Sequence, residues 1–511
     1  MIQLSSSMLT GKSFSVAQDY TLNGGTMTIP AGYTLQFDGG TISNGSIELN
    51  DTTLIGMMRH SIDAVVMGTV TNKVIKMSWF SDVNNVRLSL TNQVIQYDED
   101  AVITQTVVVP GNHITYDGMG HSFICNVTFF SLTGKSNITI KNFNASVADS
   151  VNPVTSGVDF QKMITTTANV TGIHICNNHI KGFRVGITLN TDSALYHLSD
   201  STVTDNVIEN PKGTESGQGY GIHLANARNC IVSGNTIINA DRHSIYHAYG
   251  DGNHILNNVI INHRKNHTNT SDLVPRAAIA VFRKSTNLII IGNRIVNCYN
   301  VGIHVHAFPS SYEGGTEDML YKYGCAENIV IENNSFITTN ISGNLGGLPS
   351  VMIGYIYNPQ QILYSDYANS HIKNVEIINN FFLKAATEAL LCIRIDQCLS
   401  PIIDNNLFRF VGPSSGHEAM LIRFHAQFKG CEDMVAVVRN NTFSAVNIIS
   451  GYTIFTIGNL AEVINSHFDI TVSGNTFLNQ RVNISIKYKT YKPVGITSQT
   501  STNLHLQAEA L

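Results

Sequence analysis

The chain alternates apolar and polar residues over short runs that turns separate, and one such run recurs with small variations. The phrase IVSGNTII begins at residue 231, and related phrases include IVIENNSF at 329 and VVRNNTF at 437. In each phrase an apolar-x-apolar run precedes an Asn and an apolar residue follows it. This is the two-residue period of a half-buried strand interrupted by a turn. The pattern therefore predicts many pairs of short strands joined at Asn.

Eleven such phrases can be aligned on their second or only Asn, and the intervals between aligned positions vary from 23 to 46 residues. A solenoid tolerates this irregularity, because the strands and turns of each coil stay constant while only the connections change in length. Asn accepts left-handed backbone, and stacked Asn side chains can bond to one another along a solenoid, so we assign them a structural role. The aligned residues are Asn142, Asn178, Asn206, Asn235, Asn258, Asn293, Asn334, Asn380, Asn406, Asn441 and Asn475.

A second recurring phrase occurs in the middle of the chain and predicts a further strand in each coil. It reads GITL at 186, GIHL at 221, SIYH at 244, AIAV at 278 and GIHV at 302. Stacked coils with parallel strands form a β-helix, in which every coil pairs with the coils above and below it. The predicted fold is therefore all-β, a parallel β-helix of about eleven or more coils with long loop insertions.

These Asn turns, GI-x-L strands and irregular insertions resemble those of the right-handed parallel β-helix superfamily, which includes pectate-lyase-like enzymes and phage tailspikes. The resemblance spans roughly residues 130 to 480. The N-terminal run TMTIPAGYTLQFDGGTISNGSIELNDTTLIG, followed by WF at 79, is similar to the entry segment of β-helix proteins encoded by phages and prophages of Bacteroides-type gut bacteria. The first resemblance implies a right-handed β-helix. The second implies a virion component, and tailspikes of this kind are typically homotrimers.

By pattern the chain divides into four segments. Residues 1–60 hold short strands with Gly turns and predict an attachment or capping segment, and residues 61–130 are a lead-in with strand patterns but no Asn phrase. Residues 131–480 hold the repeat. Residues 481–511 leave it, and their alternation at 482–488 predicts one more strand before a polar tail. A capping or trimer-contact role is the hypothesis for this last segment.

Composition and charge narrow the function classes. Charged residues are only 13% of the chain and the net charge is −5, without a basic run, so nucleic-acid binding lacks its electrostatic footprint. No apolar run approaches membrane-spanning length, and the N-terminus lacks the charged and apolar regions of a signal peptide. We therefore expect no membrane insertion and, if the natural chain starts here, no export by a signal peptide. No cluster has metal-ligand spacing, so the sequence assigns no metal and leaves cofactors unknown.

The second phrase also places reactive side chains on one predicted face. If its Ile residues point inward, the residues after them form one outward column and the residues two further on form another. The first column is Thr188, His223, Tyr246, Ala280 and His304, and the second is Asn190, Ala225, Ala248, Phe282 and His306. The long connections at 307–327 and 338–371 are expected to wall a groove beside this face. Candidate substrate-binding residues there are Tyr220, His243, Arg283, Lys284, His306 and Tyr312.

Three interpretations compete for that face. In a lyase, Tyr246 or His223 would remove the proton beside a uronate carboxylate, while Arg242, Arg283 or His304 would neutralise that carboxylate. A hydrolase needs two carboxylates roughly 5 to 9 Å apart. The candidates for that pair are Asp241, Asp251, Glu313, Glu317, Asp318 and Asp396. In the third interpretation the histidines and tyrosines are solvated or bind sugar without cleaving it.

The function favoured by the sequence is a phage tailspike or receptor-binding tail protein, made in the host cytoplasm and located in the virion. It would bind, and in one version depolymerise, a bacterial surface polysaccharide, with other tail proteins and further copies of itself as partners. The absent export signal and the phage-like N-terminal run favour this function over a secreted polysaccharide lyase or glycoside hydrolase. A purely structural tail or baseplate component is the remaining alternative.

Overall fold

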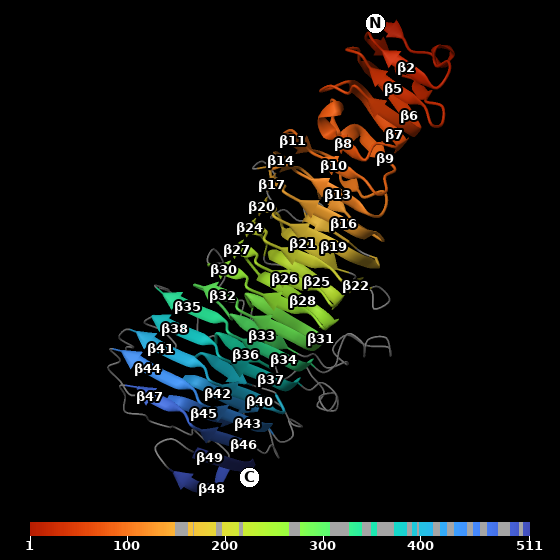
Figure 1. Cartoon of the computed structure of the whole chain (residues 1–511). Coiled ribbons are helices and arrows are strands. Elements are labelled where there is room, and N and C mark those ends of the chain that lie inside the picture. Colours follow the sequence, from red (N-terminus) through yellow and green to blue (C-terminus); the bar gives the residue numbers. More distant parts are fainter. Residues whose placement is uncertain are drawn as a thin grey trace. The chain divides into compact units, whose positions relative to one another are not determined.

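Strands make up most of the computed structural model, and they form two compact units (Figure 1). Unit 1 comprises Met1–Phe183 and Ser201–Val207, and unit 2 comprises Arg184–Asp200 and Ile208–Leu511. This division falls inside the segment 131–480 to which the sequence assigns the repeat. The structure describes residues 1–148, 162–166, 168–190, 197–213, 218–264, 276–306, 326–339, 349–354, 372–385, 391–395, 398–411, 420–426, 434–446, 453–459, 468–478, 491–499 and 504–510.

Unit 1 begins with short strands that pair in parallel around one long strand, β6 (Ile42–Ile55). The strands grouped with it are β1 (Ile2–Gln3), β2 (Ser13–Val16), β3 (Tyr20–Thr21), β4 (Thr26–Thr28), β5 (Thr34–Phe37), β7 (Ile62–Val70) and β9 (Val86–Leu88). Three single 3-10 turns occur here, η1 (Ser6–Met8), η2 (Met77–Trp79) and η3 (Val83–Asn85). The Gly-rich segment that the sequence predicts to be short strands is thus a parallel stack.

The rest of unit 1 is a series of coils, each of which adds parallel strands to the strands of the coil before it. The first row is β8 (Val74–Lys76), β10 (Val94–Gln96), β13 (Ile114–Asp117), β16 (Ser136–Lys141), β19 (Val170–Cys176) and β23 (Thr202–Thr204). The second row is β12 (Val107–Val108), β15 (Phe130–Ser131) and β18 (Lys162–Thr165). The third row is β11 (Ala101–Ile103), β14 (Ser122–Cys125), β17 (Asn144–Val147) and β20 (His179–Lys181).

Unit 2 by itself also consists of parallel sheets, three in number, whose strands are stacked one coil above another in Figure 1. The first sheet is β21 (Val185–Asn190), β25 (Tyr220–Arg228), β28 (His243–Asp251), β31 (Ile279–Ile291), β33 (Ile303–His306), β36 (Val351–Ile353), β39 (Ile393–Ile395), β42 (Met420–Ala426) and β45 (Thr453–Asn459). The second sheet is β26 (Ile231–Ser233), β29 (His254–Leu256), the end of β31, β34 (Ala326–Glu332), β37 (Ile372–Ile378), β40 (Pro401–Asp404), β43 (Met434–Arg439) and β46 (Phe468–Ser473).

The third sheet of unit 2 is β27 (Thr236–Ile238), β30 (Val259–Ile261), β32 (Arg294–Val296), β35 (Ser335–Thr339), β38 (Phe381–Ala385), β41 (Leu407–Val411), β44 (Thr442–Val446) and β47 (Thr476–Leu478). In a coil such as β28, β29 and β30, the chain therefore passes through all three sheets before the next coil begins. Two short strands join these sheets: β24 (Val207–Glu209) lies beside β27 in the third sheet, and β22 (Leu198–Ser199) pairs in parallel with the end of β25. The predicted parallel β-helix is confirmed.

The core lies between the three sheets and is made of apolar columns, because equivalent residues of successive coils are partners in register. Phe336, Phe382, Phe408 and Phe443 show this most directly, with ring centroids 4.7 to 4.9 Å apart and planes within 7° of parallel. All four are buried. Burying a side chain of this size stabilises the fold by about 1.5 to 3 kcal/mol.

A ladder of buried Asn side chains runs along the turn between the second and third sheets. In unit 2, each ladder Asn after Asn235 accepts from the backbone N–H and the amide of the Asn one coil earlier, at 2.8 to 3.1 Å. The members are Asn235, Asn258, Asn293, Asn334, Asn380, Asn406, Asn441 and Asn475, and each is at most 1% exposed. The structural role predicted for these residues is confirmed.

The alignment on the second or only Asn is wrong in one coil of unit 1. The residue before each ladder Asn has left-handed backbone, as Asn177 does at φ 56° before Asn178. Asn142 has φ 59°, and the next residue, Phe143, donates its N–H to Asn178 Oδ1 at 3.0 Å. Asn142 is therefore the turn residue, and Phe143 takes the ladder position. A phrase with a single Asn does not show which of the two positions that Asn fills.

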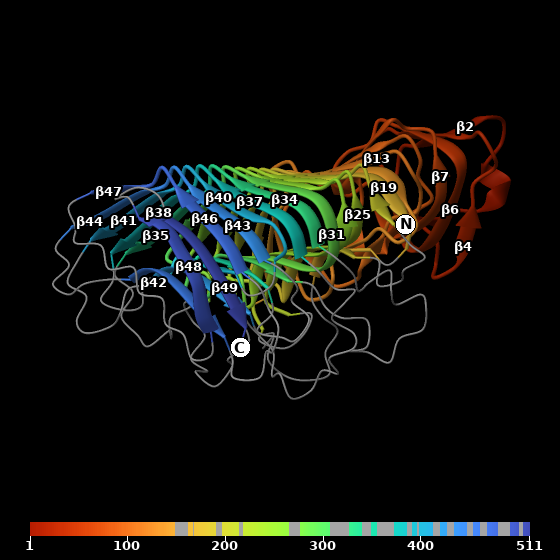
Figure 2. The same ribbon diagram turned by 90° about the horizontal axis from the view of Figure 1, so that it is seen from below.

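The last strand of unit 2 runs in the direction opposite to the strands of the second sheet. The strand β49 (Leu504–Ala510) pairs antiparallel with β46 and with β48 (Tyr491–Gln499), and β48 and β49 lie side by side in Figure 2. The sequence predicted one strand at 482–488, which lies outside the described residues, followed by a tail. The structure instead places an antiparallel pair in the last part of the chain. No helix among the residues that the structure describes is long and apolar enough to cross a membrane.

Candidate functional site

The first sheet of unit 2 aligns the two columns that the sequence predicts. In register, Thr188 pairs with His223, His223 with Tyr246, Tyr246 with Ala280, and Ala280 with His304. The second column likewise pairs Asn190, Ala225, Ala248, Phe282 and His306 in order. The strands β25, β28, β31 and β33 thus carry these side chains one coil apart, roughly 4.8 Å from one to the next.

Most of this face is buried, which the prediction of two outward columns did not anticipate. Ala277, Ala280, Val301 and Met352 form a small apolar cluster against which Tyr246 and Phe282 pack. A second cluster joins Ala225, Ala248 and Tyr249. The strands therefore have apolar packing on both sides. On this outer side, small and apolar residues alternate with aromatic ones. Three rings keep part of their surface exposed, those of His223, Tyr246 and Phe282.

The predicted residues form a continuous set of ring contacts, which we call the aromatic–histidine face. Tyr220 stacks on Tyr246 with centroids 5.1 Å apart and planes 6° from parallel, and Tyr246 lies 5.3 Å from Phe282. His223 meets the ring of Tyr246 edge-on at 4.8 Å, and the guanidinium of Arg242 lies 5.7 Å from the Tyr220 centroid. The face consists of Tyr220, His223, His243, Tyr246, Phe282, His304 and His306.

Two histidines of this face are neutral at neutral pH. His304 donates from Nε2 to the carbonyl of Gly354 at 2.8 Å, and burial lowers its pKa to about 4. His243 donates from Nδ1 to the carbonyl of Ala277 at 3.0 Å, and burial, aided by the charge of Arg242, lowers its pKa well below the ordinary value. A neutral ring supplies no positive charge. The carboxylate-neutralising role considered for His304 is therefore at odds with its surroundings.

Part of the predicted site lies outside the residues that the structure describes. Tyr312, Glu313, Glu317, Asp318 and Asp396 lie outside the described residues, as do most of the two connections expected to wall a groove. The expectation of one long loop at 338–371 is wrong, because Val351–Ile353 form β36, which pairs with β33 in the first sheet. Arg283 belongs to β31, but its side chain is not among those described. Asp241 accepts from the N–H of Gly213 at 3.1 Å. The hydrolase interpretation thus keeps two candidates in the described part, Asp241 and Asp251.

A polar pocket of about 280 Å³ lies where β25, β28 and β31 pass the face. Two of its residues were on the candidate lists, Lys284 and Asp251. Sequence reasoning missed the others, which are Asn226, Arg228, Tyr249, Gly250 and Thr286. The pocket adjoins the aromatic–histidine face, because Tyr249 belongs to the apolar cluster that Tyr246 packs against.

The chemistry of this pocket is mixed and strongly polar. Asp251 accepts from Thr286 Oγ1 at 2.6 Å and from the amide of Asn287 at 2.8 Å, so its carboxylate is held in place. Arg228 and Lys284 bring two cationic groups, and both side chains are exposed. The pocket can thus offer donors, an acceptor and an aromatic wall to one ligand.

The backbone of Tyr249 is strained, at φ 38°. Bulky side chains rarely adopt this left-handed region, and such strain concentrates at functional sites. Tyr249 both lines the pocket and belongs to the apolar cluster with Ala225 and Ala248.

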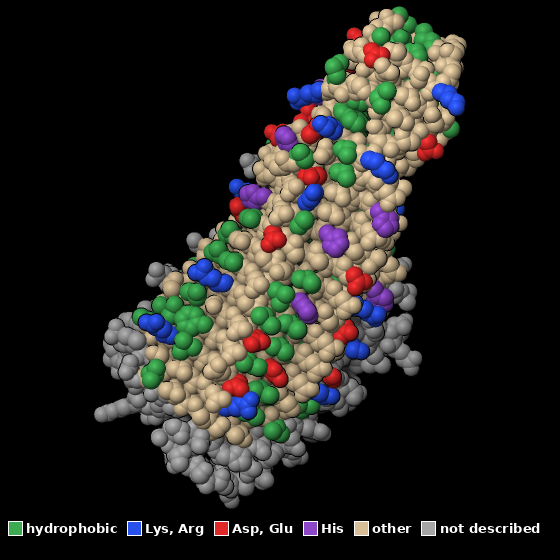
Figure 3. Space-filling model, viewed as in Figure 1, with side chains coloured by type: hydrophobic (Ala, Val, Ile, Leu, Met, Phe, Trp, Pro, Cys, Tyr) green, Lys and Arg blue, Asp and Glu red, His purple; other side chains and the backbone are tan. Residues whose placement is uncertain are grey.

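On the face shown in Figure 3, the basic and acidic groups of the described residues lie singly or in small mixed groups among uncharged ones. The described residues contain no group of three or more His, Cys, Asp or Glu side chains able to hold a metal ion.

The sequence of residues 131–313 matches the family described as a right-handed β-helix region. No curated protein matches the sequence of the chain. Solved structures with a similar fold include the catalytic unit of a GH87 α-1,3-glucanase from Streptomyces thermodiastaticus, at 14% identity and a TM-score of 0.42 over 78% of this chain and 63% of the other. The chain thus spans less than two thirds of that glucanase.

Two further solved structures resemble the chain in the same comparison. A mannuronic-acid-specific polysaccharide family 6 lyase from human gut microbiota is 11% identical, with a TM-score of 0.38 over 78% of this chain and 81% of the other. The periplasmic alginate epimerase AlgG is 10% identical, with a TM-score of 0.40 over 77% of each chain. The parallel registers show a parallel β-helix, and the family match over residues 131–313 gives it as right-handed.

Proposed function

We propose that this right-handed parallel β-helix protein binds a bacterial surface polysaccharide on unit 2, as a receptor-binding component of a phage tail. The observation that carries the binding proposal is the polar pocket beside partly exposed aromatic rings on consecutive coils. Sugar recognition needs this combination, because sugar rings have apolar faces that stack on aromatic side chains and hydroxyl rims that require hydrogen-bonding groups.

The two parts of the site would take different parts of the glycan. Tyr246 and Phe282 present rings on neighbouring coils, suited to stacking under a sugar, and His223 adds a ring nitrogen at their edge. The pocket would hold a substituent of the same or the next sugar. Its exposed Arg228 and Lys284 favour an acidic sugar, since a carboxylate pairs well with cationic donors.

The virion setting rests on the likeness of the N-terminal run to phage and prophage proteins, and a homotrimer follows from the same likeness. Light scattering on the native protein tests the assembly. A mass about three times the 55.8 kDa of the chain supports the tailspike, whereas a monomer favours the alternative of a solitary, secreted polysaccharide lyase or glycoside hydrolase.

Binding and cleavage can be separated at one residue. Tyr246→Phe keeps the stacked ring but removes the hydroxyl that a lyase would use as its proton acceptor. If the protein only binds, this variant retains its affinity, and wild type releases no fragments. If the protein is a lyase, the variant still binds while the unsaturated sugar product disappears.

The binding test uses an array of purified capsular and lipopolysaccharide glycans from gut bacteria. Tyr246→Ala removes the stacking ring, and Lys284→Gln removes one cation of the pocket. Each variant should bind a glycan that wild type recognises roughly tenfold more weakly. Arg294→Gln removes an exposed cation of β32, which does not line the pocket, and is the matched control. Equal binding by wild type, Tyr246→Ala and Lys284→Gln would place glycan recognition elsewhere and refute this site.

A further inference from the structure

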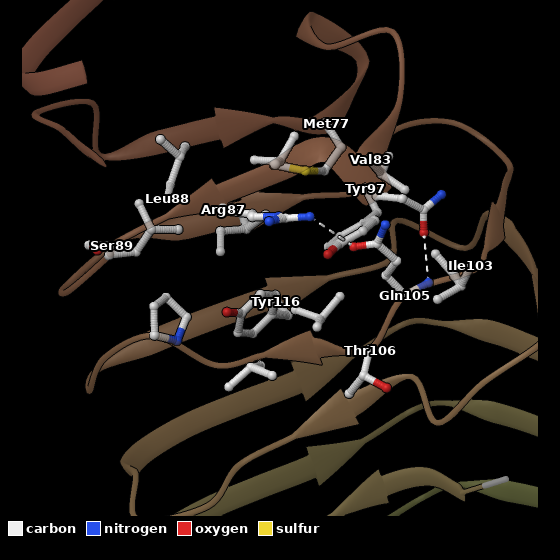
Figure 4. A pocket seen from close by; sticks show the side chains of 17 residues that line it. Met77, Val83, Arg87, Leu88, Ser89, Tyr97, Ile103, Gln105, Thr106 and Tyr116 are labelled. Atoms are coloured by element: carbon white, nitrogen blue, oxygen red, sulfur yellow. Dashed lines mark hydrogen bonds between the residues drawn. The ribbon is translucent and has the colours of Figure 1, made fainter. Parts of the chain in front are cut away.

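A cavity of about 330 Å³ lies in unit 1, far along the sequence from the site proposed above (Figure 4). It is formed where β9 and the turn η3 pass β10, β11, β12 and β13. Its volume is at the small end of the range of ligand pockets, roughly 300 to 1,000 Å³. The cavity is thus large enough for a small molecule and too small for a polymer.

The floor of the cavity is apolar and buried. Leu88, Ile95 and Ile103 line it, and each is at most 4% exposed. Such a floor favours the apolar part of a ligand, because water finds few hydrogen-bond partners there and binding removes apolar surface from solvent.

Two buried tyrosines interrupt this apolar lining. Tyr97 and Tyr116 are 4% and 1% exposed, and both rings reach in among the other lining side chains in Figure 4. Tyr97 meets the rings of Phe123 and Phe143 edge-on at 5.6 and 5.4 Å, and Tyr116 lies 5.1 Å from Phe130. Packing therefore fixes where both hydroxyls lie.

Neither hydroxyl forms a hydrogen bond to the residues that the structure describes, and neither oxygen is among the fully buried polar atoms without a partner, so both are open to the cavity. A hydroxyl in an apolar lining is stabilised by a hydrogen-bond partner from protein, water or ligand. Burial raises the pKa of both phenols, so both stay protonated at neutral pH and can donate. The cavity thus offers two hydroxyl donors to an acceptor on a ligand.

The mouth of the cavity carries a cation. Arg87 is exposed, lines the cavity and donates from Nη2 to Gln105 Oε1 at 3.3 Å, which holds its guanidinium beside the opening. Thr106 is also exposed on this rim. An anionic group at the mouth would pair with Arg87 without being buried.

We propose that this cavity binds a small amphipathic carboxylate that carries an oxygen acceptor at its opposite end. The apolar body lies on Leu88, Ile95 and Ile103, and the carboxylate pairs with Arg87 at the mouth. The hydroxyls of Tyr97 and Tyr116 donate to the inner oxygen of the ligand. This site does not depend on the polysaccharide proposal.

The test is titration calorimetry on the full chain with three matched probes. Para-hydroxyphenylpropionate has both polar ends, phenylpropionate lacks the inner oxygen, and the methyl ester of the first lacks the charge. We expect saturable binding with one ligand per chain, strongest for the first probe. Absence of saturable binding of that probe at millimolar concentration refutes the proposal and leaves a hydrated cavity.

Four variants assign the contacts. Arg87→Gln should weaken both acids by roughly tenfold and leave the ester unchanged, because only the acids form the charged pair. Tyr97→Phe with Tyr116→Phe should abolish the preference for the para-hydroxy probe. Thr106→Trp should block all three probes at the rim. Lys73→Gln, which removes an exposed cation outside the cavity, should change nothing.

Folding provides the control for the tyrosine pair. Because their hydroxyls bond to no described residue, the double variant should unfold at the same denaturant concentration as wild type or a higher one. The assignment is overturned if probe binding is unchanged in Arg87→Gln, in Thr106→Trp and in the double tyrosine variant, because the probes then bind elsewhere.

Discussion

At the scale of single residues, His247 shows how a polar side chain is accommodated inside the β-helix. Its partners in the neighbouring coils are Leu224 and Val281, so it occupies an inward, apolar column. The amide of Asn253 donates to Nε2 at 3.0 Å, which places the ring proton on Nδ1, and Nδ1 donates to Ser285 Oγ at 3.2 Å. The neutral ring is fully satisfied, and burial lowers its pKa to about 4.

This pKa makes the stability of unit 2 depend on pH. In the unfolded chain a His has a pKa of about 6.5, so between pH 6.5 and 4 the unfolded state binds the extra proton. The stabilising contribution of neutral His247 is therefore complete above pH 6.5 and is lost as the pH falls toward 4. At pH 5 the expected loss from this residue is about 2 kcal/mol.

Urea unfolding at pH 7 and pH 5 measures this contribution. Other buried histidines add to the pH dependence of wild type, among them His263, whose pKa burial lowers to about 3. The informative quantity is therefore the difference between wild type and His247→Gln. We expect the variant to lose less stability between pH 7 and pH 5 by about 2 kcal/mol. Equal losses would show that His247 is protonated in the folded protein.

At the scale of structural elements, each turn between the second and third sheets divides two tasks between adjacent residues. The first residue takes the left-handed backbone, as Asn333 does at φ 53° and Gly292 at φ 70°. The second, such as Asn334 or Asn293, turns its side chain inward and joins the ladder. Asn, Asp and Gly can do the first task, but in unit 2 only Asn does the second among the described coils.

The ladder predicts a large effect of removing one member. Asn293→Ala would remove the acceptor of the N–H and of one amide hydrogen of Asn258, and one donor to the carbonyl of Ile255, all buried. Each buried unsatisfied group costs about 1 to 3 kcal/mol, so the free energy of unfolding should fall by about 3 kcal/mol or more.

The matched control is Asn333→Ala in the next turn. Asn333 is exposed and its amide bonds only to the neighbouring Glu332 at 3.3 Å among described residues, so the cost there is that of a left-handed Ala, about 1 kcal/mol. Urea unfolding compares the two variants. If both cost the same, the ladder contributes no more than the turn geometry.

The strands and ladder could be predicted because their signals are local and repeat. The two columns could also be predicted, because in a parallel register the equivalent residues of successive phrases, such as His223 and Tyr246, are partners. The burial of the face could not be predicted, because Ala280 and Met352 meet across coils that are 72 residues apart in sequence. Arg228 and Asp251 each follow the Ile of their phrase by six residues, and that shared spacing could have located the pocket.

At the scale of the whole molecule, a solenoid must protect the open edge of its last coil. The last parallel strand of the second sheet, β46, would expose unpaired backbone groups along Phe468–Ser473, and such edges pair with other chains. Here β49 covers it by antiparallel pairing from Phe468 with Ala508 to Val472 with Leu504. The reversal of direction matters, because an antiparallel strand ends the parallel register that a further coil would need.

Deletion of residues 491–511 should therefore change the association of the protein more than its fold. The described coils up to β47 keep their own registers and ladder, so the far-ultraviolet circular dichroism of the strands should persist. The uncovered edge of β46 should instead recruit other chains, and light scattering should show a mass that rises with protein concentration. A truncated protein with the same mass as the full chain at every concentration would mean that β46 needs no cover, and that β48 and β49 serve a contact other than capping.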